Sequence, residues 1–214
     1  MAMKKTKPTF EEEKRLWREG IEHVIGIDEV GRGAFAGPIV AAGVVYTPNF
    51  RHPFLSRVND SKLLSLKQRE ELSEKIISNA LFFAIESIDI DFINRHGIGK
   101  ANIAVFRKVV KKLLKNFDDS NHFTLIDGFH GKYLPGGIKK QKAIIKGDRK
   151  SLSIASASII AKVYRDNLMK EAASVYPNYN FGQNKGYGTK THRDALKTYG
   201  VLGFHRTSFC SGWC

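Results

Sequence analysis

Short apolar segments alternate along the chain with helical patterns, and the first two segments stand on either side of a glycine-rich loop. Residues 24–30 and 38–46 are short, apolar and rich in β-branched side chains, which is typical of buried strands. Residues 80–90, 122–126 and 138–145 predict three more strands. Strands that follow one another closely pair antiparallel, whereas strands reached through helices run parallel. The pattern therefore predicts a mixed five-stranded sheet.

Apolar residues at intervals of three and four predict the helices that connect and follow these strands. We expect helices over residues 9–20, 63–79, 102–117, 151–175 and 191–199, with a short one over 89–95. Ser65 precedes the periodic part of the second helix and is a favourable N-cap residue. The order of elements predicts an α/β protein in which helices flank the sheet.

Charge and length narrow the class of protein. The 214 residues suffice for one domain, or for one domain with a small appendage. Thirty-five basic residues against 21 acidic ones give a net charge of +14, which favours nucleic acid or an anionic membrane surface as partner. A basic surface that serves only solubility is the alternative. No apolar run approaches the roughly 20 residues that span a bilayer, so we expect no transmembrane segment. Of the two kinds of partner, we expect nucleic acid and no membrane.

The ends of the chain carry few further signals. The basic amino-terminal segment has no apolar stretch after it, so it does not resemble a secretory signal. Cys210 and Cys214 are the only cysteines, which is no disulfide framework and favours the reducing cytoplasm. Their spacing near His205 suggests a metal site, but structural zinc takes four ligands, so a frayed tail is the simpler interpretation.

Four acidic residues lie beside glycines at the ends of strand-like runs: Asp28, Glu29, Asp127 and Asp148. Sites in open α/β sheets gather at the carboxyl ends of strands, so we expect these side chains to converge. Clustered carboxylates repel one another, and a divalent cation removes that penalty. Oxygen-only ligation favours Mg²⁺ or Mn²⁺ over zinc, and two such ions suit phosphodiester hydrolysis. The alternative is that Asp127 and Asp148 merely form turns.

Asp28 and Glu29 raise a question of geometry. Neighbouring side chains on a regular strand point to opposite faces of the sheet. The two acids can therefore face one site only if the strand ends or bends there. Gly31 and Gly33 directly afterwards permit such a bend, because glycine accepts positive φ angles. We accordingly expect the strand to end or to bend at this position.

Six segments also carry a family resemblance, in this order: GIDEVGRG continued by AGPIVAAGVV (26–45), DSKL (60–63), LIDG (125–128), KGD with the following helix (146–166), KGYGT (185–189) and HRTSF (205–209). The chain resembles the bacterial type 2 ribonucleases H, the ribonuclease HII family, over roughly residues 22–209. The resemblance implies a ribonuclease H-like fold with a mixed five-stranded sheet flanked by helices. It also implies an amino-terminal helical extension (1–20), a catalytic core (21–165) and a small C-terminal helical extension that binds substrate (166–214).

The resemblance assigns roles to individual residues. It places the metal ligands on Asp28, Glu29, Asp127 and Asp148. It implies that the backbone of three residues reads the ribose 2′-hydroxyl, the group that distinguishes RNA from DNA, and grips the adjacent phosphate: Gly31, Arg32 and Gly33. It further implies that the Tyr187 ring packs on the deoxyribose that follows the ribonucleotide.

Four further positions match the family with less definite roles. Lys62 matches a lysine that contacts phosphate. His205 and Arg206 match the closing motif, where contact with the substrate backbone and a purely local structural role are equally open. Asp166 is expected to be structural, paired with Lys162 or Arg165. The chain departs from the family at Ala34-Phe35, where proline-leucine is common, and at Phe129, where asparagine is common.

The implied function is an endonuclease that hydrolyses the RNA strand of RNA–DNA hybrids. It also cuts 5′ of single ribonucleotides in duplex DNA and leaves 3′-hydroxyl and 5′-phosphate ends. Mg²⁺ or Mn²⁺ is the implied cofactor, without a nucleotide cofactor, and the expected state is a cytoplasmic monomer. A non-catalytic nucleic-acid binder is the alternative, although four acids would repel phosphate. A dinucleotide-dependent oxidoreductase fits poorly, because the glycine spacing after residue 31 is one residue too long and a strand follows.

Overall fold

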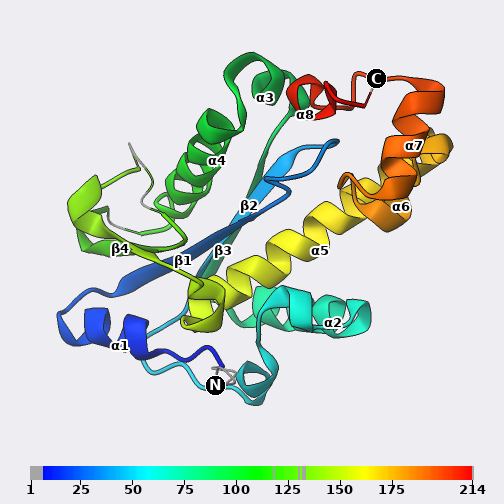
Figure 1. The fold of residues 1–214 in the computed structure, drawn as a ribbon. Helices are drawn as coiled ribbons and strands as arrows, with labels where there is room; N and C mark the ends of the chain where they lie inside the picture. The colour runs from blue at the N-terminus through cyan, green and yellow to red at the C-terminus, as the bar shows by residue number, and fades with distance from the viewer. Residues whose placement is uncertain (1–6, 118, 130, 132–133, 214) are drawn as a thin grey trace, which may run out of the picture.

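The protein is described by a computed structural model that covers residues 7–117, 119–129, 131 and 134–213. Five strands form one sheet in the order β3-β2-β1-β4-β5 (Figure 1). β1 pairs antiparallel with β2, β2 pairs antiparallel with β3, and β1, β4 and β5 run parallel. The strand bounds are His23–Val30 (β1), Ile39–Val45 (β2), Phe82–Ile88 (β3), His122–Asp127 (β4) and Gln141–Ile144 (β5). The predicted mixed five-stranded sheet is confirmed.

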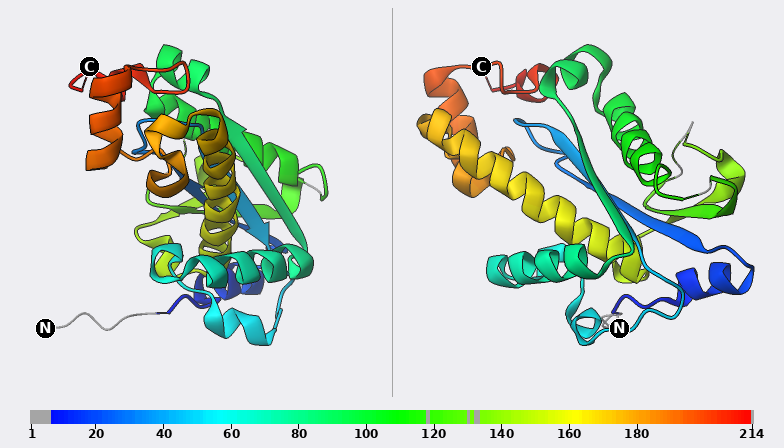
Figure 2. Two further views of the ribbon diagram at one scale, coloured as in Figure 1. Left: turned by 90° about the vertical axis from the view of Figure 1, so that its right-hand side faces the viewer. Right: turned by 180° about the vertical axis from the view of Figure 1, so that it is seen from behind.

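Helices cover both faces of the sheet (Figures 1 and 2). One face packs on α4 (Ile98–Leu113), which follows the short α3 (Ile90–His96); the other packs on α5 (Leu152–Val175) and α2 (Leu66–Asn79). The alternation of β2 separates two cores, because Ala41 faces the α4 core and Val40 faces the α5 core. Ser65 caps α2 with a reciprocal capping box to Gln68, as its sequence predicts.

α5 lies directly on β1 because Gly26 has no side chain. A Cβ atom built on Gly26 would come within 2.4 Å of the Ser153 and Ile154 backbone. The first half of α5 is rich in Ala and Ser, which allows the same close contact along its length. This contact fixes the height of α5 above the strand that carries Asp28 and Glu29.

The remaining helices lie at the two ends of the sheet. α1 (Glu11–Arg18) packs beside the start of β1, where its Glu13 is buried and accepts hydrogen bonds from the Ser151 hydroxyl and the Ser153 main-chain N–H. The far end of α5 carries a separate apolar cluster with α6 (Phe181–Asn184) and α7 (Lys190–Tyr199). The last helix, α8 (Thr207–Cys210), lies beside α3 and adds Cys210 to the same cluster. The boundary expected between residues 165 and 166 therefore falls inside one uninterrupted helix.

Several boundaries differ from the sequence predictions. The predicted strand over residues 138–145 begins with a 3₁₀ turn, Ile138–Lys140, so β5 is only four residues long. α4 begins at Ile98, four residues before the predicted start, directly after Gly97 at φ +81°.

Cys210 is buried, and Cys214 lies outside the described residues. In the ranges that the structure covers, no helix is both long and apolar enough to cross a membrane.

Candidate active site

The ends of three parallel strands bring the predicted acids together. The β1–β4 register pairs Ile27 with Ile126, so the next residues, Asp28 and Asp127, lie side by side. Asp148 follows β5 in a 3₁₀ turn, Gly147–Arg149. Asp127 Oδ1 accepts a hydrogen bond of 2.6 Å from the Gly147 main-chain N–H, which ties this turn to the end of β4.

Of the two expectations for Asp28 and Glu29, the bend is wrong, and the strand instead ends one residue after Glu29. β1 continues as a regular strand to Val30, paired with β2 along this whole stretch. Asp28 points toward α5, where the Ser158 hydroxyl donates to it, while Glu29 lines a cleft against α4. Both acids still reach one region because β4 ends at Asp127 and leaves that edge of β1 uncovered.

Burial and mutual repulsion shift the acids toward their neutral forms. Burial raises the pKa of Asp28 well above its ordinary value, and the charges of Glu29 and Asp127 raise it further. Burial raises the pKa of Glu29 to about 7, against the lowering influence of Arg32. The pKa of Asp148 is raised by burial and then by Asp127 and Asp60. An added positive charge would relieve this cost at every one of these groups.

The donor set fits a hard divalent cation. The converging groups are carboxylate oxygens, which Mg²⁺ and Mn²⁺ prefer, and burial together with their mutual repulsion raises the pKa values of Asp28, Glu29 and Asp148. Within the described residues, no three Asp, Glu, His or Cys side chains are already close enough to form a metal-binding group. Asp28 Oδ1 instead accepts from the Glu29 N–H at 2.7 Å. Carboxylate rotation would therefore accompany metal binding.

Two clefts meet at these acids and share Glu29, Arg32 and Asp127. The α5-side cleft, of about 470 Å³, is also lined by Asp28, Gly31, Gly33, Ser61, Lys62, Ser158, Lys162 and Tyr187. The α4-side cleft, of about 550 Å³, continues over the first turns of α4. Most of the predicted site residues therefore line one hollow, while Asp148 is nearly buried beside it.

Two fully buried arginines support the glycine loop from beneath. Arg206 Nη1 donates to the carbonyls of Gly31 at 2.7 Å and Arg32 at 3.1 Å, and its other nitrogens donate to Gly37. Arg165 donates to three further carbonyls, those of Ala36, Pro38 and Lys185. Both arginines are 0% exposed. The loop thus turns its carbonyls inward, toward the two guanidinium groups.

The same loop holds Tyr187. The Gly186 carbonyl accepts from the main-chain N–H groups of Phe35 and Ala36, at 2.8 and 3.1 Å. Gly186 itself has φ +79°, and a Cβ there would lie 2.4 Å from the Ala36 oxygen. The half-buried Tyr187 ring has the Arg165 guanidinium 5.5 Å from its centroid. The tyrosine and the glycine loop therefore form one connected wall of the α5-side cleft.

A pair of buried histidines fixes the Tyr187 backbone. His205 Nδ1 accepts from the Leu202 N–H at 2.9 Å, so its proton is on Nε2, which donates to His192 Nε2 at 3.1 Å. His192 Nδ1 then donates to the Tyr187 carbonyl at 3.0 Å. His205 and Arg206 are both fully buried. The structure therefore favours the local-structure alternative over substrate contact for this pair.

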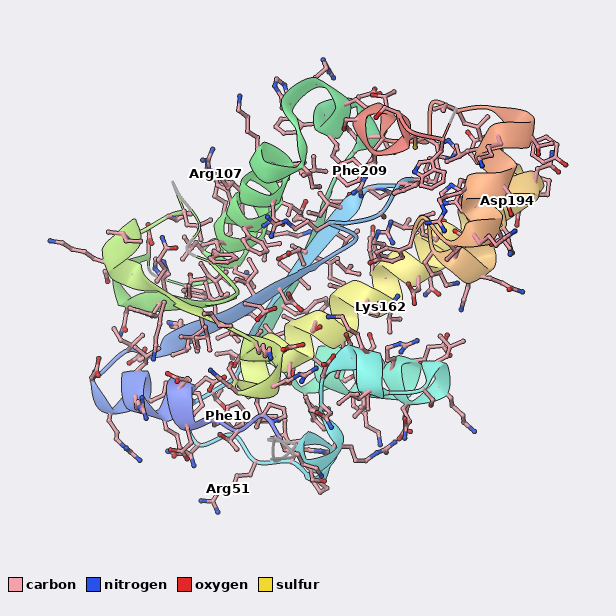
Figure 3. All side chains as sticks on the ribbon, viewed as in Figure 1. Phe10, Arg51, Arg107, Lys162, Asp194 and Phe209 are labelled. Atoms are coloured by element: carbon pink, nitrogen blue, oxygen red, sulfur yellow. The ribbon has the colours of Figure 1, made fainter. Side chains whose placement is uncertain are left out.

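Several residues of the site carry no clear signal in the sequence. Lys162 lies midway along α5, lines the α5-side cleft and pairs with Asp166 at 2.6 Å, one of the two pairings expected for that acid (Figure 3). A Lys–Asp pair four residues apart on a helix reads as an ordinary surface pair. Asp60 is buried, accepts from the Lys62 N–H at 3.0 Å and bonds Arg149, which positions Lys62 at the cleft.

The chain is similar to known proteins both in sequence and in fold. The family model "Ribonuclease HII" matches residues 25–212. A ribonuclease HII of Clostridium perfringens strain 13 is 48% identical over 188 residues, which are 88% of this chain and 66% of that protein, so the chain spans just under two thirds of this relative.

Two solved structures share the fold. One is the PCNA:RNase HII complex from Archaeoglobus fulgidus, at 24% identity and a TM-score of 0.71 over 86% of this chain and 93% of that one. The other is Bst-RNase HIII in complex with Mn²⁺, at 19% identity and a TM-score of 0.63 over 92% of this chain and 71% of that one. These likenesses confirm the predicted ribonuclease H-like architecture. With the family match over most of its length, the chain belongs to the ribonuclease HII family.

Proposed function

We propose that the chain is a metal-dependent endonuclease that hydrolyses the RNA strand of RNA–DNA hybrids and cuts 5′ of single ribonucleotides in duplex DNA. One observation carries the proposal: acids with raised pKa values meet a bare glycine loop and two lysines in a single cleft. Acids there repel a phosphodiester unless a cation lies between them, and the basic groups then hold the substrate phosphates. Family membership supports the same activity.

Asp28, Glu29, Asp127 and Asp148 would hold the metal. When bound, Mg²⁺ or Mn²⁺ supplies an activated water and stabilises the leaving oxygen of the phosphodiester. Asp127 is oriented for this task by the Gly147 N–H, and Asp28 by Ser158. The Mn²⁺ complex of the ribonuclease HIII neighbour supports a divalent ion in this fold.

The residues of the α5-side cleft would bind and orient the substrate. Gly33 has open space at its Cβ position, so the backbone of Gly31, Arg32 and Gly33 can approach the ribose, where a 2′-hydroxyl can meet main-chain groups. Lys62 and Lys162 line the same cleft and would pair with phosphates. Tyr187, at the far wall, would pack on the deoxyribose that follows the ribonucleotide. We extend the proposal to the C-terminal residues 166–214, which supply this tyrosine and its support.

The direct test is cleavage of a DNA duplex that carries one ribonucleotide, labelled at either end of the modified strand. The expected result is a single cut 5′ of the ribonucleotide that leaves a 3′-hydroxyl and a 5′-phosphate, and cutting of RNA–DNA hybrids. An all-DNA duplex of the same sequence serves as the control and should remain intact. Tight binding to both duplexes without any cut would instead identify a non-catalytic nucleic-acid binder.

A further inference from the structure

Phe129 is the most exposed large apolar side chain among the described residues, at 77%. It comes two residues after Asp127, at the rim of the α4-side cleft. A single exposed phenylalanine is not unusual in itself. The position of Phe129 is unusual, because the same cleft contains two of the proposed metal ligands, Glu29 and Asp127. A solvent-exposed aromatic ring thus borders the candidate reaction centre on the side away from Tyr187.

The cleft around Phe129 is suited to a nucleic-acid backbone. Three glycines leave the main chain bare along it: Gly99, Gly128 and Gly131. Lys100 supplies an exposed positive charge from the first turns of α4. Ile103 and Phe106 form its apolar floor. A groove with two cationic side chains, Arg32 and Lys100, bare backbone and an aromatic rim matches a sugar–phosphate chain better than a compact, charged small molecule.

The polarity of the substrate follows from the two clefts. In the proposed function, Tyr187 meets the sugar on the 3′ side of the ribonucleotide, and the glycine loop meets the ribonucleotide itself. The acids then meet the phosphate on its 5′ side, where the cut occurs. The α4-side cleft is the continuation of this path beyond the acids, since the two clefts share Glu29, Arg32 and Asp127. The next nucleotide along the path is the one 5′ of the cut.

We propose that the α4-side cleft binds the nucleotide on the 5′ side of the scissile phosphate, with the Phe129 ring packed on its sugar and Lys100 on its phosphate. This inference rests on the proposed function and adds a second sugar contact opposite Tyr187. An aromatic ring on a sugar carries no base-specific hydrogen bond, so the contact is independent of sequence. Phe129 touches no reacting atom, and its contribution is to substrate binding.

The test compares Phe129→Ala with Phe83→Ala on the single-ribonucleotide duplex. Phe83 is a matched control, because it is an exposed phenylalanine, at 41%, on β3 and lines neither cleft. Burying a phenylalanine ring in part contributes enough to change binding about tenfold. Phe129→Ala should therefore raise KM about tenfold with kcat nearly unchanged, and Phe83→Ala should change neither.

Modified substrates then locate the contact. In one duplex a propanediol spacer replaces the nucleotide 5′ of the ribonucleotide; in others the spacer stands 3′ of it or in the complementary strand. The increase in KM caused by Phe129→Ala should disappear only with the 5′ spacer, because the variant and the spacer remove the same contact. The penalty of Tyr187→Ala should disappear only with the 3′ spacer.

The outcomes separate this inference from the proposed function. If the wild-type protein cuts neither duplex nor hybrid, the proposed function fails. If the wild type cuts but Phe129→Ala behaves like Phe83→Ala, the inference alone is overturned. The inference is equally overturned if the increase in KM caused by Phe129→Ala persists with the 5′ spacer. It is also overturned if that increase disappears with the spacer in the complementary strand, because the ring would then contact the other strand.

Discussion

Alanine substitutions at Gly31 and Gly33 form a matched pair, because the Cβ position is crowded at Gly31 and open at Gly33. Gly31 has φ +90°, and a Cβ atom there would lie 2.2 Å from the Arg165 Nε atom. Gly33 has no atom within 4 Å of its Cβ position, and its φ is not in the left-handed region. Gly31→Ala should therefore disturb the fold, whereas Gly33→Ala should leave it intact.

The magnitude for Gly31→Ala follows from two contributions. The left-handed backbone costs a residue with a Cβ atom roughly 1–2 kcal/mol. Arg165 cannot move aside freely, because it is buried and its guanidinium donates to three carbonyls, so displacing it breaks at least one charged hydrogen bond worth about 1.5–3 kcal/mol. The free energy of unfolding should fall by roughly 2.5–5 kcal/mol, which corresponds to a melting temperature lower by about 5–20 °C.

Thermal and urea unfolding of the two variants beside the wild type would measure this difference. Gly33→Ala should stay within about 0.5 kcal/mol of the wild type. It should nevertheless cut a single-ribonucleotide duplex at least about tenfold more slowly, because the new Cβ stands where the backbone approaches the substrate. Equal melting temperatures for the two variants would refute the packing argument, and full activity of Gly33→Ala would refute the proposed backbone contact.

Three further predictions concern the supports of the site. Gly26→Ala should destabilise the protein by more than about 3 kcal/mol in urea unfolding, because its Cβ would meet the α5 backbone, which cannot rotate away; a loss below 1 kcal/mol would show that α5 can shift. Arg206→Lys keeps the charge but loses the guanidinium N–H groups that donate to the carbonyls of Gly31, Arg32 and Gly37. We therefore expect the free energy of unfolding to fall by about 2–4 kcal/mol and KM to rise; an unchanged melting temperature would contradict this prediction. Burial and the neighbouring His192 lower the pKa of His205 to about 4, below its ordinary 6.5. Between pH 6.5 and 4 the unfolded chain binds a proton at His205 that the native state does not bind, whereas the raised pKa of Glu29 acts in the opposite direction in both proteins. The free energy of unfolding of the wild type minus that of His205→Gln should therefore fall by up to about 3 kcal/mol over this range; a difference that does not change with pH would refute this origin.

The sequence predicted the framework of the site because that framework depends on local patterns. Apolar runs locate the strands, and the acids that end them converge because parallel strands end at one edge of the sheet. The mutual orientation of Asp28 and Glu29 was not predictable, since it depends on where β4 ends beside β1. The burial of Arg165 and Arg206 was also not predictable, because arginines are mostly exposed and the carbonyl groups that these two bind are distant along the chain.

The claim that the clustered acids hold a catalytic cation is tested most directly by the metal dependence of cleavage in wild type and Asp127→Asn. The single-ribonucleotide duplex is incubated with Mg²⁺, with Mn²⁺ or with chelator, and the melting temperature of the substrate-free protein is recorded with each metal. Wild type should cut only with a divalent ion and should be stabilised by it, as repulsion among the acids is relieved. Asp127→Asn should lose both effects while remaining folded. Cleavage that persists in chelator, or undiminished in Asp127→Asn, would contradict the account.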